Sequence, residues 1–295
     1  MGAQLIRPMR PDDVEEAERL SAAAYAGSER FEPGSDRVPV ATRPPRRAAQ
    51  WVARTRHLLA TDPAGCWVAE DAGGQVGFAV SFRRDLLWLL ASYAVTPDRQ
   101  GQGIGRPLLE AAMSHSRGCL RAMFTSSADP RAYRRYRLAG FSLHPDVRLS
   151  GVVDRSALPV VEHVREGGSS DFDLMDSLDR RLREAAHGVD HPMLASAYRL
   201  IVTDRSTGSG YAYLDDDGRP VLLAASNRRT AARLMWEALA STTPGASVSI
   251  AHVTAANEWA VDVGLAARLS VAASGYLALR GMRPPMPYLH HGSLM

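Results

Sequence analysis

The chain has 295 residues, and 45% of them are hydrophobic, enough for one large domain or two of ordinary size. Its 35 basic residues are all arginine, and the formal net charge is only +3. No recognition motif accompanies this balanced charge, so we expect no nucleic-acid partner. The longest apolar stretch, residues 86–95, is much shorter than a membrane span, so we expect no membrane association.

The first residues, MGAQLIRPMRPDDVEE, contain no apolar segment typical of a secretory signal. The two cysteines, Cys66 and Cys119, lack the spacing of a metal site and would stay reduced in the cytosol. We therefore expect a cytoplasmic protein. The sequence indicates no particular oligomeric state.

The first part of the chain alternates between strand and helix patterns. A short strand at Ile6 precedes a helix over about 11–26, and residues 27–47 are a loop rich in Pro, Gly and charge. The later elements are a helix at 48–60, strands at 66–70, 75–84 and 86–95, a helix ending near 116, a strand at 120–125, a helix at 129–139 and a strand to about 153. This order predicts an α/β fold with a mixed sheet and helices on both faces.

A second unit begins near residue 156, and a small-polar break at 164–173 lies within its linker. Its predicted elements are a helix at 174–186, a strand at 198–204, a hairpin over 210–226, a helix at 228–240, a strand at 247–253, a helix at 257–268 and a strand at 274–281. Because this order repeats that of the first unit, we predict an internal duplication. The predicted lobes are 1–155 and 156–295, each a mixed, mostly antiparallel sheet flanked by helices.

Three glycines at alternate positions, Gly101, Gly103 and Gly105, lead directly into a helical pattern. The turn lacks the lysine of a P-loop, and Arg106 stands where a dinucleotide fingerprint needs its third glycine. Glycines still let the backbone fold closely, and the first amides of a helix point outward unpaired. The turn is therefore either a simple connection or an anion site.

Two motifs in register make the first lobe resemble the GNAT superfamily of acyl-CoA-dependent N-acetyltransferases. The family's pyrophosphate motif has its counterpart at 100–105 (QGQGIG), after a strand that ends in Val95-Thr96-Pro97. The family's second motif, NxxAxxxYxxxGF, has its counterpart at 129–141. Asp129 replaces the usual asparagine there, and every other anchor is in register.

This resemblance implies acetyl-CoA as co-substrate and no metal. Backbone amides from Gly101 to Arg106 would bind the pyrophosphate, and the strand end at 93–95 would bond the pantetheine arm and the thioester carbonyl. The side chain of Arg106, and with it Arg131 or Arg134, could meet further phosphates, and the alternative for each is a solvated helix face. The predicted cofactor-binding residues are Tyr93, Ala94, Val95, Gln100, Gly101, Gln102, Gly103, Ile104, Gly105, Arg106, Asp129 and Tyr133.

Tyr136 is the predicted catalytic residue, donating a proton to the departing thiolate. A phenol has a pKa of about 10 and a thiol one of about 8.5, so a tyrosine can donate to a thiolate without being ionised at neutral pH. The alternative is a core tyrosine on the buried side of its helix. The general base stays open, because strand 86–95 contains no carboxylate. The alternatives are Asp129, His115, Asp190, the C-terminal carboxylate of Met295, or loss of the proton to water.

The acceptor site has few sequence signals. The loop at 27–47 lies where the family places segments that cover the substrate. The HGVDH segment contains His187 and Asp190, which could bind an amine, although a polar connecting loop explains them equally simply. The segment lacks enough ligands for zinc, so we expect no metal.

The second lobe resembles a degenerate copy of the first. Its counterpart of the glycine turn, residues 226–239, contains no glycine, and Gly264 stands at the tyrosine position. We therefore expect one acetyl-CoA per chain and a direct transfer of acetyl to a small amine in a ternary complex. A non-catalytic acyl-CoA-binding or regulatory module is the main alternative. An acyltransferase for protein amines would need a more open groove.

Overall fold

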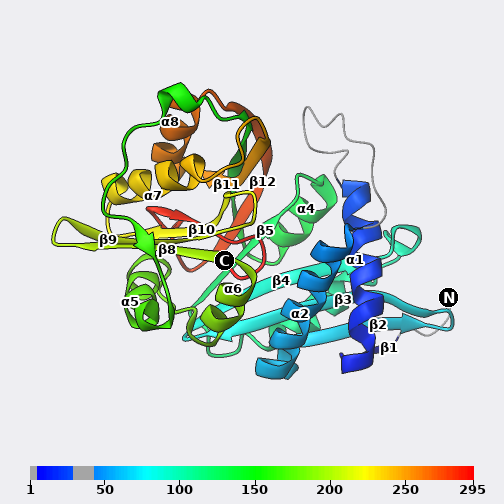
Figure 1. The fold of residues 1–295 in the computed structure, drawn as a ribbon. Coiled ribbons are helices and arrows are strands. Elements are labelled where there is room, and N and C mark those ends of the chain that lie inside the picture. Colours follow the sequence, from blue (N-terminus) through cyan, green and yellow to red (C-terminus); the bar gives the residue numbers. More distant parts are fainter. Residues whose placement is uncertain (1–4, 29–42) are drawn as a thin grey trace.

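Strands from both halves of the chain form the larger of two β-sheets in the computed structural model, which describes residues 5–28 and 43–295 (Figure 1). The larger sheet has eight strands in the order β1-β2-β3-β4-β5-β12-β6-β11. The smaller has five, in the order β13-β10-β9-β8-β7. Neighbouring strands are antiparallel apart from β4 and β5, which run parallel. The predicted mixed α/β fold is confirmed.

The first half of the chain supplies six strands of the larger sheet and four helices. The strands are β1 (Leu5–Pro8), β2 (Cys66–Asp71), β3 (Gly74–Arg84), β4 (Leu87–Val95), β5 (Arg121–Ser126) and β6 (Ser142–Val152). The helices are α1 (Val14–Ser28), α2 (Pro45–Thr61), α3 (Gly105–Ser114) and α4 (Pro130–Leu138). Most of the predicted loop at 27–47 lies outside the described residues.

Helices cover both faces of the larger sheet. Consecutive strand residues point to opposite sides, so neighbouring residues of one strand contact different helices. On β3, the ring of Phe78 packs edge-on against Trp51 of α2, with centroids 5.6 Å apart. The neighbouring Gly77 faces Leu108 of α3 instead. Along α2, Trp51, Thr55 and Leu58 are buried at helical spacing, so one side of this helix faces the sheet.

The second half supplies the smaller sheet, two strands of the larger sheet and four helices. The strands are β7 (Arg165–Glu166), β8 (Arg199–Arg205), β9 (Gly208–Leu214), β10 (Pro220–Ala225), β11 (Ser247–Thr254), β12 (Ser270–Arg280) and β13 (Tyr288–Leu289). The helices are α5 (Phe172–Arg183), α6 (His191–Ala197), α7 (Arg228–Ala240) and α8 (Glu258–Ala266). In Figure 1, α7 and α8 lie on one side of β8–β10, and α5 lies on the other. None of these helices, nor any other in the described part of the chain, is both long and apolar enough to cross a bilayer.

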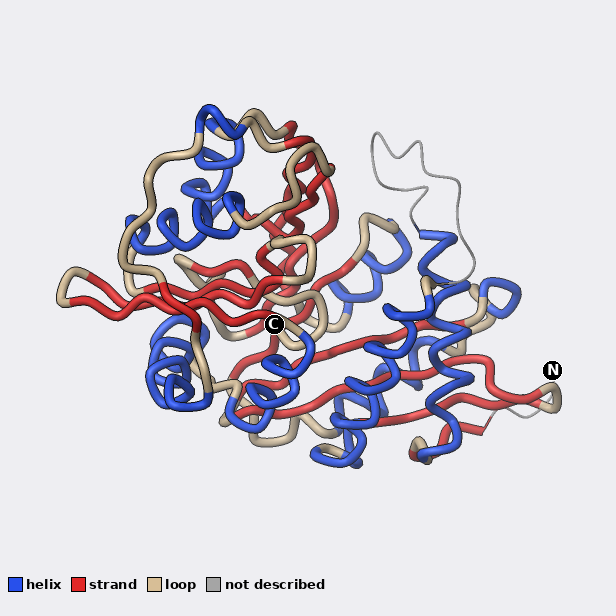
Figure 2. The backbone as a smooth tube through the Cα atoms, in the orientation of Figure 1, coloured by secondary structure: helices blue, strands red, loops and turns tan. Residues whose placement is uncertain are grey.

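The strand β12 joins the two halves of the chain. It pairs with β5 through Phe124 and Ala278, and on its other edge it pairs with β6 through Leu143 and Ala278. The next strand, β11, pairs with the far edge of β6. Strands therefore continue from one part of the molecule into the other (Figure 2). The predicted boundary at 155/156 divides the sequence, but the larger sheet contains strands from both sides of it. The division into two lobes stays a proposal.

The C-terminal segment occupies the free edge of β10. There β13 pairs antiparallel with β10 through Leu289 and Leu223. The buried Asn257, just before α8, holds this segment with both ends of its side-chain amide. Its nitrogen donates to the Pro285 carbonyl at 3.1 Å, and its oxygen accepts from the Tyr288 amide at 2.9 Å. The segment is thus part of the core.

We expect Asn257→Ala to lower the free energy of unfolding by about 3 kcal/mol, because it leaves buried backbone groups of the C-terminal segment without partners. Asn227→Ala is the matched control, since this asparagine also precedes a helix and caps it by accepting from the Thr230 amide at 2.9 Å, while its nitrogen donates to the exposed Thr207 carbonyl at 3.0 Å. Loss of such a cap costs about 1 kcal/mol. Urea unfolding of the full chain measures both values, and equal losses would contradict the anchoring role.

Candidate functional site

The strands β4 and β5 separate part-way along the sheet. Their parallel pairing covers only Leu87 to Leu89 of β4, whereas the other edge of β5 pairs with β12 from Ala122 to Ser126. An irregularity in the pairing of β3 with β4 falls at the same level, where Ala91 is the extra residue on β4. The edge of β4 that faces β5 is therefore open over 90–95, as a strand edge that can bond a ligand's amides.

A cavity of about 710 Å³ opens at this point and is lined by both halves of the chain. That volume is typical of a small-molecule site. The first half contributes residues of α1, α2, β4, the glycine turn, the end of β5 and α4. The second half contributes His252 of β11, Ser274 and Gly275 of β12, and Gly292 and Ser293 of the C-terminal segment.

The glycine turn forms one end of the cavity. Gly101 and Gly103 have φ angles of +80° and +89°, which other residues rarely adopt. A side chain at Gly105 would collide with the hydroxyl of Tyr93, which donates to the Gly105 carbonyl at 2.8 Å. Helix α3 begins at Gly105. The residue before it, Ile104, makes no side-chain hydrogen bond that would cap the helix. Its first amides are therefore available to an anion.

The cavity wall is strongly basic. Among the described residues, seven arginines line it and only one carboxylate does, that of Asp129. The arginines are Arg43, Arg54, Arg99, Arg131, Arg134, Arg135 and Arg148. Such a wall suits a ligand with several phosphates, which guanidinium groups bind in pairs of hydrogen bonds. The side chain of Arg106 pairs instead with Glu110, and only its backbone amide belongs to the turn.

Tyr136 lies on α4 in the cavity wall, among other aromatic rings. Its ring centroid is 4.5 Å from that of Phe124 and 6.4 Å from that of Tyr93. Burial raises the pKa of Tyr136 well above its ordinary value. The hydroxyl therefore keeps its proton at neutral pH, as a donor to a departing thiolate must.

The two other predicted residues of this helix have different surroundings. Asp129 caps α4 by accepting from the Arg131 amide at 2.8 Å, and its carboxylate also pairs with the Arg131 guanidinium. An aspartate thus fills the capping role at this position. The ring of Tyr133 packs against Tyr276 of β12 with centroids 5.1 Å apart, outside the cavity lining.

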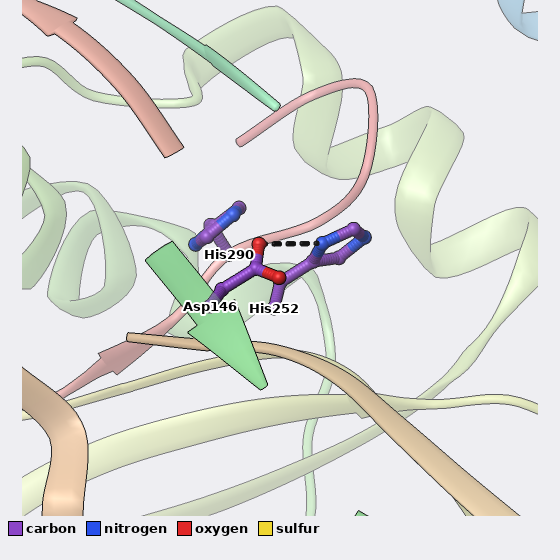
Figure 3. Close-up of side chains that lie close together, drawn as sticks. All are labelled: Asp146, His252 and His290. Carbon is purple, nitrogen blue, oxygen red and sulfur yellow. Dashed lines mark ion pairs between the residues drawn. The ribbon is translucent and has the colours of Figure 1, made fainter. Parts of the chain in front are cut away.

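A cluster of His252, Asp146 and His290 borders the cavity (Figure 3). The carboxylate of Asp146 lies between the two rings, with its Oδ2 3.5 Å from Nδ1 of His252. Its Oδ1 accepts from the Gly275 amide at 2.7 Å, which fixes the carboxylate. Burial and the neighbouring His252 lower the pKa of His290 well below its ordinary value, so that ring is neutral.

The backbone at His252 has a φ of +64°, rare for a residue with a side chain. The pairing of β11 with β6 is irregular between Ile250 and Val253, at the same place. The irregular stretch presents His252 to the cavity, and such conformations often occur at functional sites. The sequence analysis missed this cluster, because its members come from β6, β11 and the C-terminal segment and share no motif.

Three of the four proposed general bases lie outside the cavity lining. His115 pairs with Asp62 at 3.2 Å, and Asp190 is buried against Arg84 and His57. The terminal Met295 is buried, and its carbonyl oxygen accepts from Arg183 and Tyr288. Asp129 alone lies in the wall.

The predicted acceptor residues also lie away from the cavity. His187 pairs with Asp179 at 2.7 Å, and Asp190 belongs to the buried network with Arg84. Neither His187 nor Asp190 lines the cavity, so their contact with the acceptor stays a prediction that the cavity does not support. Within the described part of the chain, two groups of side chains have the ligand types for a metal ion. They are Asp146, His252 and His290, and Asp179, His187 and His191.

Residues 62–143 match the sequence profile of the family described as Acetyltransferase (GNAT) domain. This stretch contains β4, the glycine turn and Tyr136. Over these residues the chain is similar to the GNAT acetyltransferases, a superfamily of acyl-CoA-dependent N-acyltransferases. A sequence search of curated proteins found no match.

Solved structures resemble the chain over nearly its whole length. A candidate acetyltransferase from Pyrococcus horikoshii has a TM-score of 0.75 and 17% identity, covering 99% of this chain and 95% of its own. A GCN5-related N-acetyltransferase from Sphaerobacter thermophilus has a TM-score of 0.57 and 14% identity, and the match covers 96% of this chain and 97% of the other. A tandem GNAT protein from the clavulanic acid biosynthesis pathway has a TM-score of 0.55 and 15% identity, and the match covers 94% of this chain and 98% of the other. At these identities the likeness concerns the fold.

We expect Asp190→Asn to lower stability and to leave catalysis unchanged. Burial opposes ionisation of Asp190, but hydrogen bonds from His57 and Arg84 outweigh it and lower its pKa from 3.8 to about 2. The ionised form therefore stabilises the fold by about 2 kcal/mol above pH 4, and this contribution is lost as the pH falls through 2.

Urea unfolding of wild type and variant at pH 7 and pH 3 checks this expectation. The difference between the two proteins should shrink at the lower pH. A difference independent of pH, or a raised KM for the acceptor, would contradict it.

Proposed function

We propose that this protein is an acetyl-CoA-dependent N-acetyltransferase that transfers acetyl directly to a small amine in a ternary complex. The observation that carries the proposal is one cavity that contains the uncapped start of α3, the open edge of β4 and Tyr136. The helix start suits the pyrophosphate, and the strand edge suits the two amides of a pantetheine arm. The rings of Tyr93, Phe124 and Tyr136 pack together at the wall, which favours a small acyl group.

Only the first lobe offers such a site, so we propose one acetyl-CoA per chain. In the second lobe, the strand before the corresponding helix is β10, and β13 covers its free edge. The helix itself, α7, is capped by Asn227, which occupies the Thr230 amide. A cofactor there would have to displace both the C-terminal segment and the cap.

The transfer forms a carbon–nitrogen bond and breaks the carbon–sulfur bond of the thioester. Tyr136 donates its proton to the departing sulfur, and a backbone amide near Val95 stabilises the carbonyl oxygen. His252 accepts the proton that the amine loses, and Asp146 holds the ring and balances its positive charge. The position of His252 in the wall and its 3.5 Å distance from Asp146 support this role. This chemistry needs no metal.

Arg54 suggests the class of acceptor. It lies on α2 in the cavity wall, and no carboxylate in the described part of the chain pairs with it. Burial lowers its pKa to about 10, so the guanidinium is still charged at neutral pH. The Arg54 side chain is half-buried, a cation in such surroundings without a counter-charge is costly, and an anionic ligand would relieve the cost. We propose a small amine that also carries an acidic group.

Thiol release from acetyl-CoA in the presence of paired amines, with and without a carboxylate or phosphate, tests the activity. We expect turnover with acidic amines. Arg54→Met should raise the KM for an acidic amine roughly 10- to 100-fold, the value of a charge-assisted hydrogen bond, and leave a neutral amine unaffected. Arg47→Met, on the same helix but outside the cavity lining, is the control. Binding of acetyl-CoA without turnover of any amine would favour the non-catalytic module.

Gly103→Val should weaken acetyl-CoA binding roughly 10- to 100-fold, because it distorts the turn that presents the amides. Gly118→Val is a matched control. Gly118 has a φ of +83° and open space around it, like Gly103, but lies outside the cavity lining. Calorimetry on the two folded variants measures the affinity and the number of sites per chain. Equal affinities, or two equivalent sites, would contradict the assignment.

Tyr136→Phe and His252→Asn should each lower kcat by about 10²-fold or more without weakening acetyl-CoA binding, because each group acts in the transition state. His252→Asn should also remove the rise in rate that accompanies deprotonation of the base as pH increases. His163→Asn, at a half-exposed histidine outside the cavity lining, is the control. A pH–rate profile unchanged by His252→Asn would exclude His252 as the base.

A further inference from the structure

A second group of metal-ligating side chains lies where α5 meets the turn before α6, away from the cavity. Asp176 and Asp179 are three residues apart on α5 and therefore share one side of the helix. His187 and His191 come from the turn and the start of α6, and both face these carboxylates. Asp179, His187 and His191 are fully buried.

Ligand atoms of Asp179, His187 and His191 all lie within 4.8 Å of one another, and Asp176 lies beside His191. Nε2 of His191 is 3.2 Å from Oδ1 of Asp176 and 3.6 Å from Oδ2 of Asp179. Nδ1 of His187 is 2.7 Å from the same Oδ2 of Asp179. Ligands about 2.0–2.1 Å from a tetrahedral zinc ion stand about 3.3 Å apart.

Two ring nitrogens in this group are buried without a hydrogen bond, Nε2 of His187 and Nε2 of His191. Nε2 of His191 has no hydrogen-bond partner in the described part of the chain, although two carboxylates lie close by. Its other nitrogen, Nδ1, lies 3.1 Å from the hydroxyl of Tyr213. A neutral ring that bonds Tyr213 through Nδ1–H presents a free electron pair at Nε2.

Further hydrogen bonds hold the carboxylates in place. The Tyr211 hydroxyl donates to Oδ1 of Asp179 at 2.6 Å, and the Gly188 amide donates to Oδ1 of Asp176 at 2.9 Å. Together with Tyr213 on His191, these groups give three of the four ligands an outer partner. Metal sites are commonly supported in this way.

We propose that Asp176, Asp179, His187 and His191 bind one divalent cation with the preferences of zinc. Two imidazoles and two carboxylates suit zinc, and the ion balances both negative charges. The buried surroundings indicate a structural ion that ties α5 to α6. The sequence analysis expected no metal, because the HGVDH segment supplies only the histidines and the carboxylates come from the preceding helix.

Titration of the chelator-treated full chain with ZnCl₂ in a calorimeter tests this site independently of any activity. We expect one ion per chain and at least a 100-fold loss of affinity in Asp179→Asn and His191→Asn. Asp176→Asn, at the more exposed ligand, serves if the buried variants do not fold. Co²⁺ in place of zinc should give the visible absorption of a tetrahedral site in wild type and lose it in the variants.

The cavity cluster supplies the decisive control, since Asp146, His252 and His290 also have ligand types for a metal. His252→Asn should bind zinc as tightly as wild type does. Failure of wild type to bind zinc would overturn the proposal. Binding that is lost in His252→Asn and kept in Asp179→Asn would overturn it as well, by moving the ion to the cavity.

Discussion

The insertion of β12 between β5 and β6 is the interaction on which the rest of this structure depends. A sheet in which β5 and β6 paired directly would lack the strand that brings Ser274 and Gly275 to the cavity. The hydrogen bonds of β12 with both neighbours also fix where β5 leaves β4, and so fix the width of the opening beside the glycine turn. Because backbone pairs form on both edges of β12, the two halves of the chain cannot separate without breaking the sheet.

The cavity therefore combines groups with different origins. The glycine turn and Tyr136 belong to the segment that matches the GNAT profile, residues 62–143. His252 comes from the second half, on β11, where the pairing of this strand with β6 is irregular. A second half that has no glycine turn of its own can still supply chemistry to the first. Under the proposed function, the first half binds the cofactor and the second half contributes the base to the same cavity.

Local features were readable from the sequence, and non-local ones were not. Helix α7 spans 228–240 as its periodicity predicts, and the glycine turn and Tyr136 both lie in the cavity wall. The seven-residue helix α6 was missed because it is too short to show a period. The position of β12 was missed because an apolar strand pattern identifies a strand but not its partners. The cluster of Asp146, His252 and His290 depends on those partners, so no spacing along the chain could have indicated it.

The buried C-terminal segment has a consequence for how the protein is made. Residues 285–295 follow all the other described elements along the chain, yet they cover β10, bond Asn257 and contribute Gly292 and Ser293 to the cavity. The first 155 residues can collapse early, but β5 and β6 must wait for β12 before their sheet closes. The cavity wall is therefore completed only when residues 285–295 have been synthesised and packed, and a chain that stops before them has an incomplete site.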